Sequence, residues 1–324
     1  MRRDVPLRVK VADKKAKPRA ALSDKDFRYP RERVTYWQAV LALALCCIIP
    51  AGITLVVVLR TAAPGTMPMW QVPAFFVLWP ILCLVVVPVL AGRPMRKRIK
   101  ESGRQAKVMA NNYPEIHQLV RSQCRTLGIR EPDVYVLDDE VAQVVTIAGA
   151  RPAVVITRPV LNALTGEELA AAIGHELGHI KAGHVRMENV LKFMQGAAPS
   201  WKLLFGPATV LRILLGMWGQ MIECTADRVA LLLTNKVAAV NTAVVKLAVE
   251  ADSLAQVDPR ELRAYLSSSG ELSTDSSQVE RHYRIGTFIS QQPGLRERIA
   301  QLIEYAGSEQ AQSALSKLTP AQGA

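Results

Sequence analysis

Residues 175–179 read His-Glu-Leu-Gly-His, and this pentapeptide constrains the fold more than any other stretch of the chain. Residues 165–168 upstream read Thr-Gly-Glu-Glu, a capping box that predicts a helix running from there to about residue 190. His175 and His179 are four residues apart, so on a helix they lie one turn apart on the same face. This spacing allows both imidazoles to bind one tetrahedral Zn²⁺.

Glu176 lies between the two histidines, in a position to accept a proton from a metal-activated water rather than to bind the metal itself. The chain has only five histidines, so a chance match to the whole pattern is rare. The alternative interpretation is a pair of surface histidines on an ordinary amphipathic helix.

A tetrahedral site of this kind needs a third protein ligand, and its identity decides the subclass. The positions where a metzincin has its Gly and its third His hold Ala182 and Val185, and His184 falls one residue short. A carboxylate is therefore the expected third ligand. Glu188 is the nearest candidate, but we expect it to continue the same helix and to lie too far along it.

Glu223 is the better candidate for the third ligand. It begins a Glu-x-x-x-Asp pair with Asp227 after a very apolar stretch, so both carboxylates share one helical face. Charges in such surroundings are costly unless something holds them. A metal would hold Glu223, and a histidine ligand would hold Asp227 as its hydrogen-bond partner. A solvated pair of acidic side chains is the alternative.

These residues carry a family resemblance. The pentapeptide at 175–179, followed by Glu-Cys-Thr-Ala-Asp-Arg at 223–228, resembles the HtpX-like family of membrane zinc metallopeptidases, which also includes the CAAX prenyl proteases. The resemblance covers roughly residues 105–304. Near its end, Gln-Pro-Gly-Leu-Arg-Glu-Arg-Ile at 292–299 is similar to the His-Pro-x-x-x-x-Arg-Ile signature of the family.

The resemblance implies a set of site residues. By it, one Zn²⁺ per chain is held by His175, His179 and Glu223, Glu176 is the catalytic base, Asp227 is the acidic partner of a ligand, and Arg298 is a further candidate at the site. One departure is Gln292, which stands where the family usually has His. His282 could substitute for that histidine, and an exposed loop histidine is the alternative.

Two long uncharged runs predict a membrane hairpin. Residues 37–59 are 23 residues without a charge and residues 72–92 are 21, and each is long enough to span a bilayer as a helix. Residues 1–36 hold twelve Lys and Arg and residues 93–107 hold seven, against one in the connector 60–71. The positive-inside rule then places both ends of the hairpin in the cytoplasm. Buried core helices are the alternative.

The net charge of +12 is explained by these basic flanks of the hairpin. Nucleic-acid binding is the rival explanation of the basic balance, and it is disfavoured because the basic clusters flank the uncharged runs and include few aromatic residues. The five cysteines form neither a disulfide framework nor a Cys-x-x-Cys metal site.

The segment 201–222 is also mostly apolar, but two ligands that share one metal must lie on the same side of a membrane. The chain between His179 and Glu223 is too short and too charged for two crossings. We therefore expect 201–222 to be buried core or a surface that dips into the bilayer interface.

The expected fold class is mainly α with a small β-sheet (α+β). The expected regions are a basic cytoplasmic arm (1–36), a transmembrane hairpin (37–92), a gluzincin-type metallopeptidase domain (93–309) and a flexible tail (310–324). Helices are predicted at about 114–127, 159–164, 165–190, 218–234, 236–256 and 294–305, and strands at 133–138, 142–148 and 153–157. The second of these strands could be an open edge that pairs with an extended substrate, or a plain structural strand.

The expected function is a zinc endopeptidase anchored in the cytoplasmic (inner) membrane, with its catalytic domain in the cytoplasm. Its partners would be the lipid bilayer and protein or peptide substrates, as in membrane-protein quality control. A membrane-anchored scaffold protein that keeps the metal fold without turnover is the alternative. A CAAX-type enzyme would need many more spans than two. The sequence does not indicate an oligomeric state.

Overall fold

The computed structural model describes residues 22–41, 107–148, 151–185, 187–188, 208–248 and 295–318, together with the single helical positions 52, 56, 60, 97, 99 and 101. Nearly all of the predicted hairpin, as well as His282 and Gln292, lies outside these residues. Within them, no helix combines the length and the apolar character needed to cross a membrane. The hairpin therefore stays a prediction.

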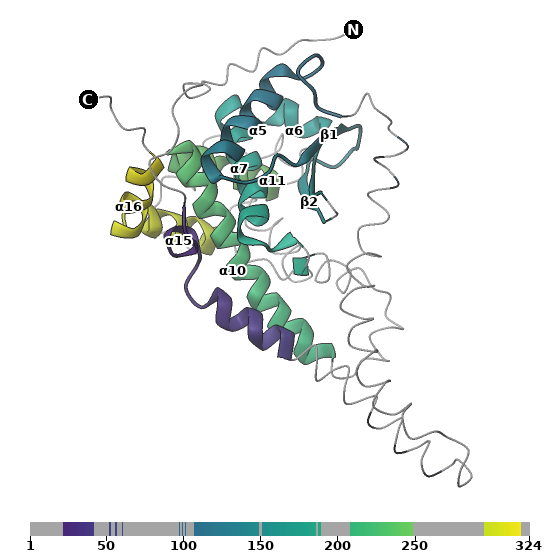
Figure 1. Cartoon of the computed structure of the whole chain (residues 1–324), viewed down its shortest axis with the longest axis vertical. Helices are drawn as coiled ribbons and strands as arrows, with labels where there is room; N and C mark the ends of the chain where they lie inside the picture. The colour runs from purple at the N-terminus through teal and green to yellow at the C-terminus, as the bar shows by residue number, and fades with distance from the viewer. Residues whose placement is uncertain are drawn as a thin grey trace, which may run out of the picture.

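A mainly helical domain with a small sheet is confirmed (Figure 1). The described helices that have defined bounds are α1 (Asp24–Phe27), α5 (Pro114–Leu127), α6 (Arg158–Ala163), α7 (Gly166–Ala182), α10 (Ala208–Thr234), α11 (Val237–Ala248), α15 (Leu295–Ala306) and α16 (Glu309–Leu318). Residues 32–41 are also helical. Helix α10 begins about ten residues before its predicted start.

The sheet contains β1 (Asp133–Leu137), β2 (Val144–Ile147) and β3 (Ala153–Thr157) in the order β1-β3-β2. Strand β3 pairs with β1 in parallel and with β2 antiparallel. All three strands are rich in β-branched residues, which pack well on a pleated surface. Residues 154–156 of the central strand are completely buried. Strand β2 forms one edge, and among the described residues its ladder partner is β3 alone.

Helices α7 and α10 pack closely because two glycines of α7 face α10. A Cβ atom added at Gly178 would lie 3.0 Å from the Cβ of Val229 and 3.1 Å from the Cα of Ala226. One added at Gly174 would lie 3.3 Å from the Cα of Ala230. Small residues at these positions let the two backbones approach, so the side chains next to the glycines reach α10.

The N-terminal segment, residues 22–36, packs into the helical body. Phe27 is completely buried, and its neighbour Asp26 accepts a 2.6 Å hydrogen bond at its carbonyl oxygen from the Tyr305 hydroxyl on α15. The predicted basic arm over 1–36 therefore includes a part, residues 22–36, that is packed against the domain. This segment carries apolar side chains that join the main core, in addition to its basic residues.

The helical residues 32–41 lie alongside the N-terminal half of α10 (Figure 1). The rings of Tyr36 and Trp218 are 5.9 Å apart, and Trp218 is buried. Met217, next to it on α10, is 43% exposed. One face of the described part of segment 201–222 is therefore core.

The predicted tail at 310–324 is wrong for residues 310–318, which belong to α16. Ala311 and Ala314 are completely buried on one face of this helix. Their small side chains let α16 pack against α1 of the N-terminal segment. A segment of small and polar residues is therefore ordered by a partner that is distant in the sequence.

Candidate metal centre

The side chains of His175, His179 and Glu223 converge where α7 crosses α10. The two Nε2 atoms of the histidines are 3.1 Å apart. The carboxylate oxygens of Glu223 lie 3.4 Å from Nε2 of His175 and 3.8 Å from Nε2 of His179. Ligand atoms of a tetrahedral zinc site are about 3.3 Å apart, given bonds of about 2.0–2.1 Å. Two imidazoles and one carboxylate, facing one point at these separations, fit a zinc ion.

Helix α7 starts at a capping box, as predicted. The Thr165 hydroxyl accepts a hydrogen bond from the Glu168 amide, and the Glu168 carboxylate accepts one from the Thr165 amide at 2.7 Å. The helix then ends at Ala182 rather than near residue 190, because Gly183 takes a left-handed conformation with φ of 80°. Gly183 thereby sets the direction in which the chain continues after α7, relative to the two histidines.

Glu188 was expected to continue α7 away from the metal, and this expectation is wrong. The chain turns back after Gly183, so Oε2 of Glu188 lies 3.7 Å from Nδ1 of His179. Nδ1 is on the opposite side of the ring from Nε2, which faces the other two ligand atoms. Glu188 is therefore near a histidine of the cluster without joining its converging atoms.

Asp227 and Arg298 support the His175 side of the cluster. Oδ1 of Asp227 lies 2.8 Å from Nδ1 of His175. The Arg298 guanidinium donates two hydrogen bonds to Asp227, at 2.8 and 2.7 Å, and lies 3.1 Å from Glu223. A carboxylate on the far nitrogen of a ligating histidine fixes the ring and its tautomer. The structure thus brings both of these candidates to the cluster, Asp227 from α10 and Arg298 from α15.

Electrostatics keep the carboxylates on this side of the cluster ionised. Burial lowers the pKa of His175, but its hydrogen bonds with Asp227 and Glu223 outweigh burial and raise that pKa to about 10. Burial raises the pKa of both carboxyl groups, but the positive charge of Arg298 and the contacts with His175 together outweigh it and lower their pKa values. Both carboxylates therefore stay ionised at neutral pH beside the imidazole nitrogens, which favours a bound cation.

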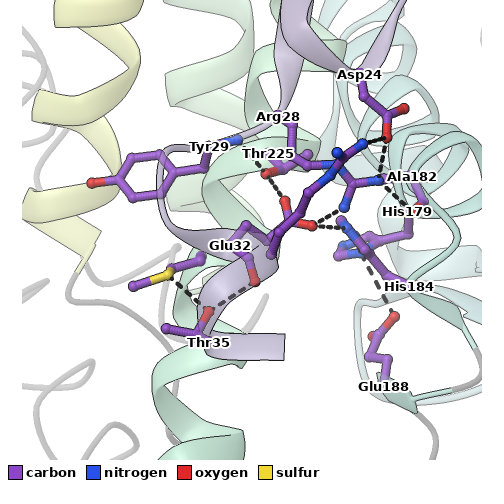
Figure 2. Close-up of polar contacts among 12 residues, drawn as sticks. Asp24, Arg28, Tyr29, Glu32, Thr35, His179, Ala182, His184, Glu188 and Thr225 are labelled. Atoms are coloured by element: carbon purple, nitrogen blue, oxygen red, sulfur yellow. Dashed lines mark hydrogen bonds and ion pairs between the residues drawn. The ribbon is translucent and has the colours of Figure 1, made fainter. Parts of the chain in front are cut away.

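His184 and Glu32 support the His179 side, and sequence reasoning assigned neither residue a role there. Nδ1 of His184 lies 3.3 Å from Nδ1 of His179, and its Nε2 lies 3.0 Å from Oε1 of Glu32 (Figure 2). Burial lowers the pKa of His184 despite its hydrogen bond with Glu32, so this imidazole is neutral at neutral pH. Position 184 was noted only for falling one residue short of another motif. No local pattern marks Glu32.

Glu176 lies at the buried junction of α7 and β2. Its Oε2 accepts a 2.6 Å hydrogen bond from the hydroxyl of Thr146, which is itself almost completely buried on β2. Sequence reasoning did not identify Thr146. The bond ties one carboxylate oxygen of Glu176 to the edge strand of the sheet.

Comparisons with known proteins identify this chain as similar to metallopeptidases. The sequence model of peptidase family M48 matches residues 110–306. The plastoglobule-localized metallopeptidase 48, chloroplastic, of Arabidopsis thaliana is 29% identical over 184 residues, which are 55% of this chain and 52% of that protein.

Two relatives are named protease HtpX homolog. The one from Thermoplasma volcanium is 39% identical over 82 residues, 24% of this chain and 26% of that protein. The one from Methanocaldococcus jannaschii is 26% identical over 132 residues, 39% of this chain and 46% of that protein. The chain thus spans about half the length, or less, of these curated relatives. The N-terminal segment, residues 22–36, lies before the part matched by the family model.

Proposed function

The chain belongs to peptidase family M48, which confirms its resemblance to the HtpX-like metallopeptidases, and from this membership we propose that it is a membrane-anchored, zinc-dependent endopeptidase. The convergence of His175, His179 and Glu223 carries the proposal, because two imidazoles and a carboxylate that face one point are the ligand set of a hydrolytic zinc site. Zinc, when bound, would polarise the scissile carbonyl and make the attacking water more acidic.

Glu176 is the general base in this proposal. It follows the first ligand on α7, and its carboxylate would take the proton of the attacking water and pass it to the leaving amine. The hydrogen bond from Thr146 fixes one carboxylate oxygen of Glu176. Asp227 and Arg298 hold the ring of His175 in the orientation in which its Nε2 faces the other ligand atoms.

Strand β2 is the proposed docking site for the substrate backbone. It carries Thr146, the partner of the base, and it forms an edge of the sheet. An extended peptide that adds to such an edge is held by main-chain hydrogen bonds, which are independent of its sequence. This mode suits an endopeptidase that acts on unfolded segments of proteins, as quality control of membrane proteins requires.

The membrane anchor is proposed to be a hairpin of spans at 37–59 and 72–92. The packing of residues 22–36 against the helical body supports it, because these residues and the metal cluster must share one side of any membrane. The chain between them then crosses an even number of times, and the basic flanks favour the cytoplasmic side. In cells with an otherwise cysteine-free protein, a cysteine at Thr66 should react with an impermeant thiol reagent, and one at Arg260 should not.

The test of the enzymatic proposal is Glu176→Gln in the full-length, detergent-solubilised protein. The wild type should contain about one zinc per chain and should cleave an unfolded protein such as casein. Glu176→Gln should keep the zinc and lose hydrolysis by at least about 100-fold, the lower end of what general-base catalysis contributes. Equal activity of the two proteins would refute the assigned role. A wild type that binds zinc without cleaving anything would favour the scaffold function instead.

A further inference from the structure

A buried chain of three side chains runs from His179 to the N-terminal segment. His179, His184 and Glu32 are each at most 3% exposed, and they form successive contacts of 3.3 and 3.0 Å (Figure 2). Glu32 is 152 residues away from His184 in the sequence. A buried carboxylate from so distant a segment is costly to desolvate unless its partners compensate.

The positions of the protons along this chain follow from the cluster of ligands. If Nε2 of His179 directs its lone pair at a metal, the ring proton is on Nδ1. Nδ1 of His184, at 3.3 Å, is nearer than Oε2 of Glu188 at 3.7 Å and accepts that proton in a hydrogen bond, which leaves the proton of His184 on Nε2. Nε2 of His184 in turn donates to the carboxylate of Glu32. In this arrangement the Nδ1–H of His179 and the Nε2–H of His184 each have an acceptor.

Glu32 is fixed and kept ionised at the end of this chain. The Thr225 hydroxyl on α10 donates to one of its oxygens, and the Arg28 guanidinium forms an ion pair with the other. Burial raises the pKa of Glu32, but the contacts with His184, Thr225 and Arg28 outweigh burial and lower it. Arg28 also donates a 3.0 Å hydrogen bond to the carbonyl of Ala182, at the last residue of α7. The carboxylate is thus anchored to both helices that carry the metal ligands.

We propose that Glu32 is a positioning residue of the metal centre, which orients the ligand His179 through His184. The centre is then completed by a segment that precedes the predicted hairpin and lies outside the part matched by the family model. The inference rests on the proposed metal site. It assigns to the N-terminal segment a role in metal binding, beyond attachment of the chain to a membrane.

The rival explanation is that Glu32 only helps to dock the N-terminal segment. Asp26 provides a matched control, because it is a second buried carboxylate of the same segment. Its Oδ1 lies 2.6 Å from Nζ of Lys317 on α16, and its contacts do not include His184. Asp26→Asn and Glu32→Gln are both isosteric changes from a carboxylate to an amide. Docking is weakened in both variants, whereas the chain to His179 is altered only in the second.

The experiment measures zinc affinity by competition with a chelator, in full-length protein in detergent, and the visible spectrum of the Co²⁺ form. Glu32→Gln should weaken zinc binding about tenfold and shift the Co²⁺ bands, because outer partners of ligating histidines contribute about 10–100-fold to metal affinity. Asp26→Asn should leave both unchanged while lowering the unfolding temperature of the metal-free protein.

A double-mutant cycle makes the test specific. His184→Gln should weaken zinc binding as Glu32→Gln does, and the double variant should be no weaker than His184→Gln alone, since both changes break the same chain. Additive losses, or wild-type affinity in Glu32→Gln, would overturn the inference while leaving the proposed function intact. Unchanged zinc affinity in the His179→Ala variant would instead refute the proposed metal site, and the inference with it.

Discussion

The two histidines of the proposed metal centre are supported in different ways. His175 is in direct contact with the carboxylate of Asp227, which Arg298 fixes in turn. His179 is reached by the carboxylate of Glu32 only through the ring of His184. A charge in contact with a ligand acts on it strongly, whereas a charge one imidazole away acts mainly by orienting the ring between them. Of these two carboxylates, Asp227 thus supports its histidine electrostatically, and Glu32 supports its histidine by position.

The largest effect should come from removing the ligand that both histidines face. Glu223→Ala should lower zinc affinity by more than about 100-fold, beyond the range of changes to outer partners. Glu188→Ala should cost far less, because Glu188 lies near Nδ1 of His179 rather than near its Nε2. Zinc content after dialysis, determined by elemental analysis, checks this. Loss of zinc from Glu188→Ala with retention in Glu223→Ala would show that the third ligand is misassigned.

The direct support of His175 should matter more than the relayed support of His179. Asp227→Asn should weaken zinc binding by about 10–100-fold, and by more than Glu32→Gln does, because only Asp227 contacts a ligand. Chelator competition on both variants at one pH gives the comparison. Equal losses in the two variants would mean that the relay through His184 transmits charge as well as orientation, and the distinction drawn above would fail.

Gly174 precedes His175 and Gly178 precedes His179, so substitutions at the two glycines of α7 compare the packing of the backbone beside each histidine. Gly178→Ala should cost about 1–3 kcal/mol of stability, the range for overpacking, because its Cβ would meet backbone atoms of Ala226 that cannot move aside. Gly174→Ala should cost less, since its nearest neighbour, at 3.2 Å, is the flexible end of Leu233. Urea unfolding of the metal-free proteins measures both changes. A larger cost at Gly174 would contradict the packing of α7 on α10.

The smallest effect concerns pH. A carboxyl group whose pKa is lowered by folding stabilises the protein above its ordinary pKa of 4.5, and this stabilisation is lost as the pH falls through the lowered value. The stability advantage of metal-free wild type over Glu32→Gln should therefore be present at about pH 7 and shrink by about pH 3. Urea midpoints at the two pH values test this. An advantage that grows in acid would mean that the pKa of Glu32 is raised in the folded protein.

Features with local causes were predictable from the sequence. The capping box at Thr165 starts α7 where predicted, and Gly128, in a left-handed conformation, ends α5 where predicted. Such signals act within a few residues, so no knowledge of the rest of the fold is needed. The His-Glu-x-x-His spacing on a helix and the Glu-x-x-x-Asp pair on a second helix are of the same kind.

Features that depend on distant partners were not predictable. Glu32 is one of three acidic residues in the segment 22–36, and only the folded chain places it beside His184. Residues 310–318 were predicted to be a flexible tail because they are small and polar, but Ala311 and Ala314 pack on one buried face of α16 and order this helix. The end of α7 at Ala182, short of the predicted end near residue 190, has a local cause, because Gly183 is a residue type that commonly ends helices.

The long separation between Glu32 and its partner on α10 has a consequence for the time at which the centre is completed during synthesis. The hydrogen bond between Thr225 and Glu32 joins residues 193 positions apart. At about 5–20 residues added per second, about 10–40 s pass between the synthesis of the two residues. Both histidines of α7 are synthesised near the end of that interval, and they lack Glu223 and the docked N-terminal segment while the next 44 residues are added. We therefore expect the nascent chain to be inert until α10 has left the ribosome, so that ribosome-bound chains stalled before residue 223 bind no zinc tightly.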